Sequence, residues 1–174
     1  MLRVISLFKG MKIVISESQY KRLMESESDQ KVLRIPSLKF FNDDWFQLQE
    51  FLEKKGNPPY SIGGELDLRR TPIESLGNLV SVGGGLMLYN TPIESLGNLQ
   101  SVGGYLDLTG TQIKSLRNLQ SVGGYLSLLN TPIKSLGDLQ SVVGNLDLRD
   151  TPLSKMYNEK QIRKMVNVEG DIYL

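Results

Sequence analysis

Three aspartates, Asp67, Asp107 and Asp147, come nearest to a catalytic arrangement in this sequence. They occupy the same position in alternate copies of a 20-residue repeat, so stacked copies would hold them about 10 Å apart. That separation is too large for sharing one metal ion and lies near the upper limit for the carboxylate pair of an inverting glycosidase. Met87 and Ser127 occupy the intervening copies. We therefore predict a protein that is not an enzyme and binds no metal or cofactor.

The composition removes most other chemistries. The sequence has no cysteine and no histidine, which excludes histidine-based zinc sites and the usual nucleophilic triads. Its 20 basic residues balance 19 acidic ones, so no strong charge attracts nucleic acid or an anionic membrane. No apolar run is long enough for a transmembrane helix, and the apolar start is too short for a secretory signal. We expect no nucleic-acid or membrane partner, and a cytoplasmic location agrees with the lack of cysteine.

The repeat dominates the sequence. Its copies begin at Ser61, Ser81, Ser101, Ser121 and Ser141 and share the pattern S-[VI]-x-G-x-L-x-L-x-x-T-x-[IL]. A partial copy, NVEGDIYL, ends the sequence after an insertion of six residues. Alternation within each copy predicts a short strand with leucines on one face and variable residues on the other. One copy buries too little apolar surface to fold alone, so we predict stacking into a right-handed parallel β solenoid of about six coils.

The constant polar and small residues have structural interpretations. A threonine follows every strand, where its hydroxyl can satisfy backbone groups freed by the bend. Gly-Gly pairs at 63, 83, 103 and 123 precede the strands, where a positive φ or a close approach of the backbone is needed. Recurrence in successive coils favours this turn role over a phosphate-binding loop.

The repeat also carries a family resemblance. The motif L-x-L-x-x-T-x-I resembles the L-x-L-x-x-N-x-L core of leucine-rich repeats, with threonine in the asparagine position. The phrase S-L-x-N-L-x-S-V-G-G-x-L-x-L is similar to the receptor L-domain, a β-helix-like relative of those repeats. The resemblance covers residues 61–153 and part of 167–174 and implies a parallel solenoid that recognises partners through its strand face. The segment MKIVISESQYKRL resembles the start of many large-phage proteins, which implies a viral or bacterial intracellular protein.

The ends of a solenoid need covers. Residues 1–60 are predicted to form an N-terminal α/β cap on a solenoid of residues 61–174, with a strand at 12–15 and helices at about 17–25 and 44–55. Asn42 or Asp43 is the expected N-cap of the second helix, and its aromatic residues are interpreted as cap core rather than as a ligand groove. Because Met11 offers a second start, residues 1–10 are also open to interpretation as an upstream extension.

A short helix is predicted inside the C-terminal insertion. Asn158 and Gln161 have the spacing of an N-terminal capping pair, and Ile162, Met165 and Val166 follow at helical spacing. The last strand would then have an open edge.

The variable positions predict the working surface. Tyrosine and methionine near the centre, flanked by aspartate and arginine, are typical of a protein-binding patch with a charged rim. The predicted partner-binding residues are Met87, Tyr89, Tyr105, Asp107, Tyr125, Leu129, Asp67, Asp147, Arg69 and Arg149. The alternative is a solvated sheet in which stacked tyrosines only strengthen neighbouring strands.

We therefore predict a non-enzymatic module that binds a protein partner through the outward face of its parallel strands. An alternative is a structural or assembly subunit that associates through the solenoid ends, with Ile172, Tyr173 and Leu174 as the assembly edge. Carbohydrate binding on the tyrosine and aspartate face is a third interpretation. The expected state is a monomer or a weak homo-oligomer.

Overall fold

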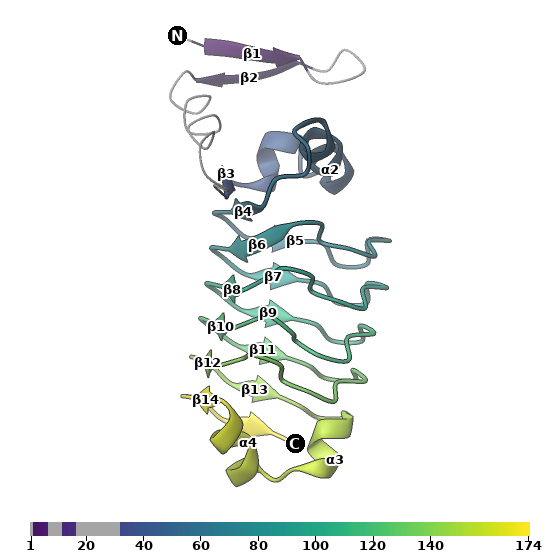
Figure 1. The fold of residues 1–174 in the computed structure, drawn as a ribbon, viewed down its shortest axis with the longest axis vertical. Helices are drawn as coiled ribbons and strands as arrows, with labels where there is room; N and C mark the ends of the chain where they lie inside the picture. Colours follow the sequence, from purple (N-terminus) through teal and green to yellow (C-terminus); the bar gives the residue numbers. More distant parts are fainter. Residues whose placement is uncertain (1, 7–11, 17–31) are drawn as a thin grey trace.

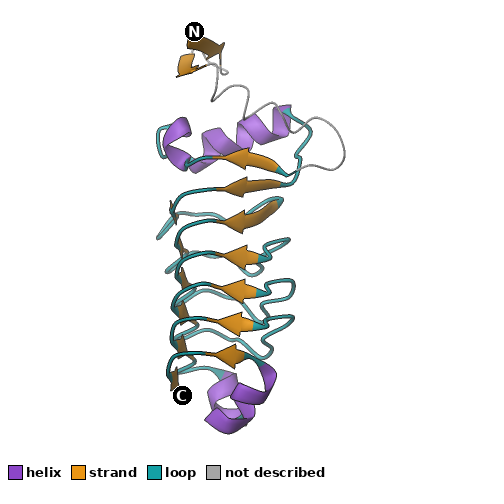
Figure 2. Cartoon of the chain, turned by 90° about the vertical axis from the view of Figure 1, so that its left-hand side faces the viewer, coloured by secondary structure: helices purple, strands orange, loops and turns teal. Residues whose placement is uncertain are grey.

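The computed structural model describes residues 2–6, 12–16 and 32–174. Most of the last range is a stack of short coils that forms a parallel β-solenoid, with helices at its two ends (Figures 1 and 2). Where the sequence predicts one strand in each copy, the chain instead contributes one short strand to each of two parallel sheets.

The two sheets are named after the residues that recur in them. The Ser-Val sheet contains β3 (Leu33–Ile35), β4 (Tyr60–Ile62), β6 (Leu79–Val82), β8 (Ser101–Val102), β10 (Ser121–Val122), β12 (Ser141–Val142) and β14 (Asn167–Val168). The Leu-Asp sheet contains β5 (Leu66–Asp67), β7 (Leu86–Met87), β9 (Leu106–Asp107), β11 (Leu126–Ser127), β13 (Leu146–Asp147) and β15 (Ile172–Tyr173). Equivalent residues pair directly, as Leu106 does with Leu126, so the repeat in the sequence becomes the rung of the stack.

The interior is a single column of aliphatic side chains. In the coil that begins at Ser101, the side chains of Leu106, Leu108, Ile113 and Leu116 are all completely buried. The same positions are buried in neighbouring coils, and the resulting core is continuous from Leu33 to Val168. The predicted inward orientation of the leucines is confirmed, and each coil depends on its neighbours for burial.

The Gly-Gly pairs are required by close approach between coils. A Cβ on Gly103 would collide with the backbone of Gly83 in the preceding coil, while Gly103 N–H donates to the Val82 carbonyl at 2.8 Å. Neither of these glycines is among the residues with positive φ. Of the two predicted reasons for glycine here, the structure therefore supports the close approach.

The threonines close the bend after each strand of the Leu-Asp sheet. Thr111 Oγ1 donates to the Leu108 carbonyl at 2.7 Å, and Thr131 Oγ1 donates to the Leu128 carbonyl at the same distance. Both threonines are buried, so these bonds satisfy polar groups that water cannot reach. The predicted role of the threonines is confirmed.

The solenoid has about four complete turns, from Ser61 to Ser141, instead of the predicted six. The next turn is irregular because α3 (Pro152–Met156) and α4 (Glu159–Met165) replace its return path. The final copy consists of β14 and β15. The count differs because two of the six sequence copies do not form complete regular turns.

The N-terminal end of the core is covered by η2 (Leu38–Phe41) and α2 (Trp45–Lys54). Phe41 and Trp45 are buried, which agrees with the cap-core interpretation, whereas Phe46 is 58% exposed. The N-cap of α2 is Asp44, not Asn42 or Asp43 as predicted. Those two residues have positive φ, whereas an N-cap residue is extended.

Other N-terminal predictions have different outcomes. β2 (Lys12–Ser16) contains the predicted strand and pairs antiparallel with β1 (Leu2–Ser6). The helix predicted at about 17–25 lies outside the described residues. β3 precedes the predicted boundary at residue 60 yet belongs to the Ser-Val sheet; the boundary itself stays a prediction.

In the C-terminal helices, one prediction from the sequence is confirmed and another is wrong. Asn158 and Gln161 form the predicted capping box of α4, and Ile162 is buried beneath it. Met165, which the apolar pattern placed inward, is 46% exposed. In the part of the chain that the structure describes, no helix combines the length and apolarity needed to cross a membrane.

Candidate functional site

The residues that alternate with the inward leucines along the Leu-Asp sheet, together with those flanking its strands, are called the Leu-Asp face below. All ten residues predicted to bind a partner belong to it, but Met87 and Asp147 are only 8% and 1% exposed. The structure adds an organisation that the pattern did not reveal, because most of these side chains contact a neighbour from another coil.

In the N-terminal half, Tyr105 lies against the preceding coil. Its hydroxyl is 3.2 Å from Sδ of Met87, and its ring passes beside Gly85. Met87 is only 8% exposed as a result. Met87 therefore packs against Tyr105 and has little surface left to contact a partner.

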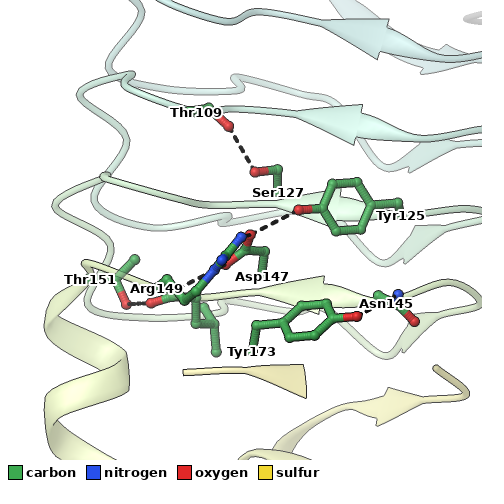
Figure 3. Close-up of polar contacts among 9 residues, drawn as sticks. Thr109, Tyr125, Ser127, Asn145, Asp147, Arg149, Thr151 and Tyr173 are labelled. Carbon is green, nitrogen blue, oxygen red and sulfur yellow. Dashed lines mark hydrogen bonds and ion pairs between the residues drawn. The ribbon is translucent and has the colours of Figure 1, made fainter. Parts of the chain in front are cut away.

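In the C-terminal half, Asp147 is the centre of a network (Figure 3). The Arg149 guanidinium donates to both of its carboxylate oxygens, at 3.0 and 2.6 Å, and the Tyr125 hydroxyl donates at 3.0 Å. The Arg149 guanidinium also lies 5.6 Å from the centre of the Tyr173 ring. Four side chains from three coils thus restrain one another.

The electrostatics of this network follow from its contacts. Burial alone would raise the pKa of Asp147, but hydrogen bonds from Arg149 and Tyr125 outweigh it, and the pKa of this carboxyl is lowered. Burial raises the pKa of Tyr125. Asp147 is 1% exposed and carries its negative charge within a fully occupied set of hydrogen bonds.

Asp67 and Arg69 repeat the pairing near the other end of the face. Arg69 donates to both oxygens of Asp67, at 2.9 and 2.7 Å, and these bonds lower the pKa of Asp67. Next to this pair, the guanidinium of Arg70 lies 5.8 Å from the centre of the Tyr89 ring. Asp67, Arg69, Arg70 and Tyr89 line an open pocket of about 480 Å³.

The middle of the face is polar, and its aspartate has no arginine partner among the described residues. Asp107 accepts a hydrogen bond from Thr109 N–H at 3.0 Å, and the Thr109 hydroxyl lies 2.8 Å from the Ser127 hydroxyl. Ser127 is buried, and Leu129 is half-buried beside it. No ion pair to Asp107 occurs within the described ranges.

The predicted assembly edge lies at β15. In inner coils Leu126 N–H donates to the Asn145 carbonyl of the next coil, but the equivalent N–H of Ile172 has no acceptor among residues that the structure describes. Tyr173 and Leu174 are 40% and 42% exposed.

The neighbouring edge of the Ser-Val sheet is closed by a side chain. Arg163 of α4 donates to the carbonyls of Val168, at 2.7 Å, and Gly170, at 3.0 Å. The equivalent carbonyl in the preceding coil, that of Val142, accepts the N–H of Glu169. Arg163 thus replaces the backbone donors of a further coil.

Residues 2–6, 12–16 and 32–174 contain no group of acidic side chains placed to hold a metal ion. Two of the three aspartates considered for catalysis, Asp67 and Asp147, form ion pairs with arginines. The Asp-x-Arg spacing of these pairs is visible in the sequence as D-L-R, whereas the support that Gly85 and Asn145 give to the tyrosines has no local signal.

In comparisons with known proteins, the chain matches no family model, no curated protein and no solved structure. Its function must therefore be inferred from the geometry of the Leu-Asp face.

Proposed function

We propose that the protein is a non-enzymatic module that binds a protein partner through the Leu-Asp face. The observation that carries this proposal is the mutual restraint of the face residues, as in the contacts of Asp147 with Tyr125 and Arg149. A surface whose side chains are already fixed loses less conformational entropy on binding than a mobile one. The aspartates hold the arginines and tyrosines in positions where a partner can contact them.

The exposed residues of the face have suitable chemistry. Tyr125 and Tyr173 are 36% and 40% exposed, and tyrosine combines a large apolar area with few rotatable bonds. Tyrosine and arginine are also enriched among the residues that dominate binding energies. We expect Tyr125, Tyr173 and Arg149 to supply most of the contact energy in the C-terminal half.

We further propose that the coils are related to leucine-rich repeats. The inward leucines support this proposal, as does the threonine in the asparagine position, because its hydroxyl donates to a carbonyl at the end of the strand. A cytoplasmic location, a non-enzymatic role and a viral or bacterial origin stay predictions.

The test compares two truncations of exposed aromatic side chains. Tyr125→Ala should weaken binding of a partner isolated from the source organism by about tenfold or more, because it removes a central aromatic contact. Phe46→Ala is the control, since Phe46 is 58% exposed, more than Tyr125 at 36%, and lies on α2 outside the Leu-Asp face. Equal binding by wild type and both variants would refute the proposed function.

One observation favours a second function, association of copies through β15. Because the N–H of Ile172 has no acceptor within the described part of the chain, the edge can accept another strand. We expect molar mass from light scattering to rise with concentration, and Leu174→Pro, which removes a neighbouring N–H, to prevent the rise. A molar mass that stays monomeric at every concentration would contradict this alternative.

A further inference from the structure

The repeat allows one carboxylate of the Leu-Asp face to be compared with its own equivalents. Asp67 and Asp147 each receive two side-chain hydrogen bonds from the arginine two residues later. Asp107 has the same position in its coil, but residue 109 is threonine. All three aspartates accept the backbone N–H of the residue two positions later, at 3.0–3.1 Å, but Asp107 lacks the guanidinium that its two equivalents have.

The surroundings of Asp107 leave its carboxylate accessible. Its register neighbours are Met87 in the preceding coil and Ser127 in the following one, and both are buried. Asp107 itself is half-buried. Along the chain its outward neighbours are engaged elsewhere: the Tyr105 ring lies against Gly85 and Met87 of the preceding coil, and the Thr109 hydroxyl lies 2.8 Å from that of Ser127.

No other described side chain supplies the missing cation by direct contact. Arg69 and Arg149 lie two coils away on either side, about 10 Å along the stack, and each is held by its own aspartate. The outward positions of the Leu-Asp face have more acidic than basic residues, namely Glu65, Asp67, Asp107, Asp147 and Asp171 against Arg69 and Arg149. This excess suits a basic partner.

We propose that Asp107 is the docking point for an arginine side chain of the protein partner, an inference that rests on the proposed function of the Leu-Asp face. The incoming guanidinium takes the place that Arg149 takes on Asp147. Arginine fits better than lysine because the existing pairs use two parallel hydrogen bonds, a geometry that a planar guanidinium provides and an ammonium does not.

The test uses a display library of short random peptides selected against the complete chain. Peptides that bind wild type should be enriched in arginine, and the enrichment should change to aspartate and glutamate when the selection is repeated on Asp107→Arg. Failure to recover any binding peptide, or arginine enrichment that survives the charge reversal, would overturn the proposal.

Three variants then locate the contact on the face. Asp107→Asn should weaken a selected arginine peptide by about tenfold to a hundredfold, whereas Asp138→Asn, the same change at an exposed aspartate outside the Leu-Asp face, should leave the affinity unchanged. Thr109→Arg should also abolish binding, because it supplies an intramolecular guanidinium to Asp107. Equal affinity of wild type and Thr109→Arg would count against the docking point.

The outcomes separate this inference from the proposed function. A peptide or partner that is lost with Tyr125→Ala but bound equally by wild type, Asp107→Asn and Thr109→Arg would leave the face as the binding surface and refute the arginine contact. A ligand unaffected by all of these variants would refute both.

Discussion

The ring of Tyr105 occupies the space that a side chain at Gly85 would fill. A Cβ built on Gly85 would lie 2.5 Å from Cε1 and 2.7 Å from Cζ of that ring. Glycine at residue 85 therefore allows a tyrosine of the next coil to reach Met87. The absence of a side chain at one position of the Leu-Asp face determines the conformation of its neighbour.

Gly85→Ala should consequently lower the free energy of unfolding by about 1–3 kcal/mol, the usual cost of forcing extra volume into a packed site. Urea denaturation measures the change. In a Tyr105→Ala background the same substitution should be nearly neutral, because the ring that it displaces is gone. An equal loss of stability in both backgrounds would show that the strain lies in the backbone and not between these two side chains.

Asp147 should make stability depend on acid pH. Its folded-state pKa is lowered by Arg149 and Tyr125 despite burial, so the stabilisation is fully present above the ordinary aspartate pKa of about 3.9 and is lost as pH falls through the lower folded pKa. We expect Asp147→Asn to be less stable than wild type by about 2 kcal/mol at neutral pH. The difference should narrow below about pH 4. Denaturation curves at neutral and acid pH provide the test, and a constant difference would contradict it.

Arg117 should be a site where glycine stabilises the fold. Its φ of 48° lies in the left-handed region, and the equivalent residues of other coils are Gly77, Gly97 and Gly137, with φ of 58–60°. Relief of the unfavourable backbone conformation should exceed the entropy cost of glycine, so Arg117→Gly should raise the free energy of unfolding by about 0.5–1 kcal/mol. Arg117→Ala, which removes the side chain but keeps the Cβ, should give no such gain. Thermal unfolding of both variants distinguishes the two effects.

Arg163 should protect the last rung of the Ser-Val sheet. Arg163→Ala removes the donors to the Val168 and Gly170 carbonyls, so the Glu169 amide, which donates to Val142, should exchange its hydrogen about tenfold faster. Glu159→Gln is the control because it weakens the ion pair at 2.8 Å but leaves the carbonyl contacts intact. The measurement is the hydrogen-exchange rate of the Glu169 amide. Equal rates in wild type and both variants would contradict this role.

The features that the sequence predicted well are those repeated in every copy or set by a short local signal. Inward leucines follow from alternation, and the Asn158 capping box follows from two residues three positions apart. The second sheet was missed because Ser101–Val102 lies outside the alternating run of its copy, whereas the equally short Leu106–Asp107 lies within it. α3 was missed because Thr151-Pro152 resembles the Thr-Pro step of other copies, where the chain forms no helix.

The candidate site was predictable as a surface but not as a network. The segment D-L-R occurs at both 67–69 and 147–149, yet the side chain of Asp67 is 44% exposed and that of Asp147 is 1% exposed. The difference comes from Tyr125, which reaches Asp147 from the preceding coil. Such contacts depend on which coils are neighbours, so identical local sequences acquire different environments.

The direction of the backbone hydrogen bonds has a mechanical consequence. Successive strands are stacked along the long axis of the molecule (Figure 1), and the bonds between coils, such as Leu106 N–H to the Tyr125 carbonyl, point along that axis. A pulling force applied at the two ends of the solenoid would load these rungs in series, so we expect the coils to peel away successively at low force. Compression along the same axis would instead press each coil against the next. We therefore expect the solenoid to resist axial compression better than axial tension.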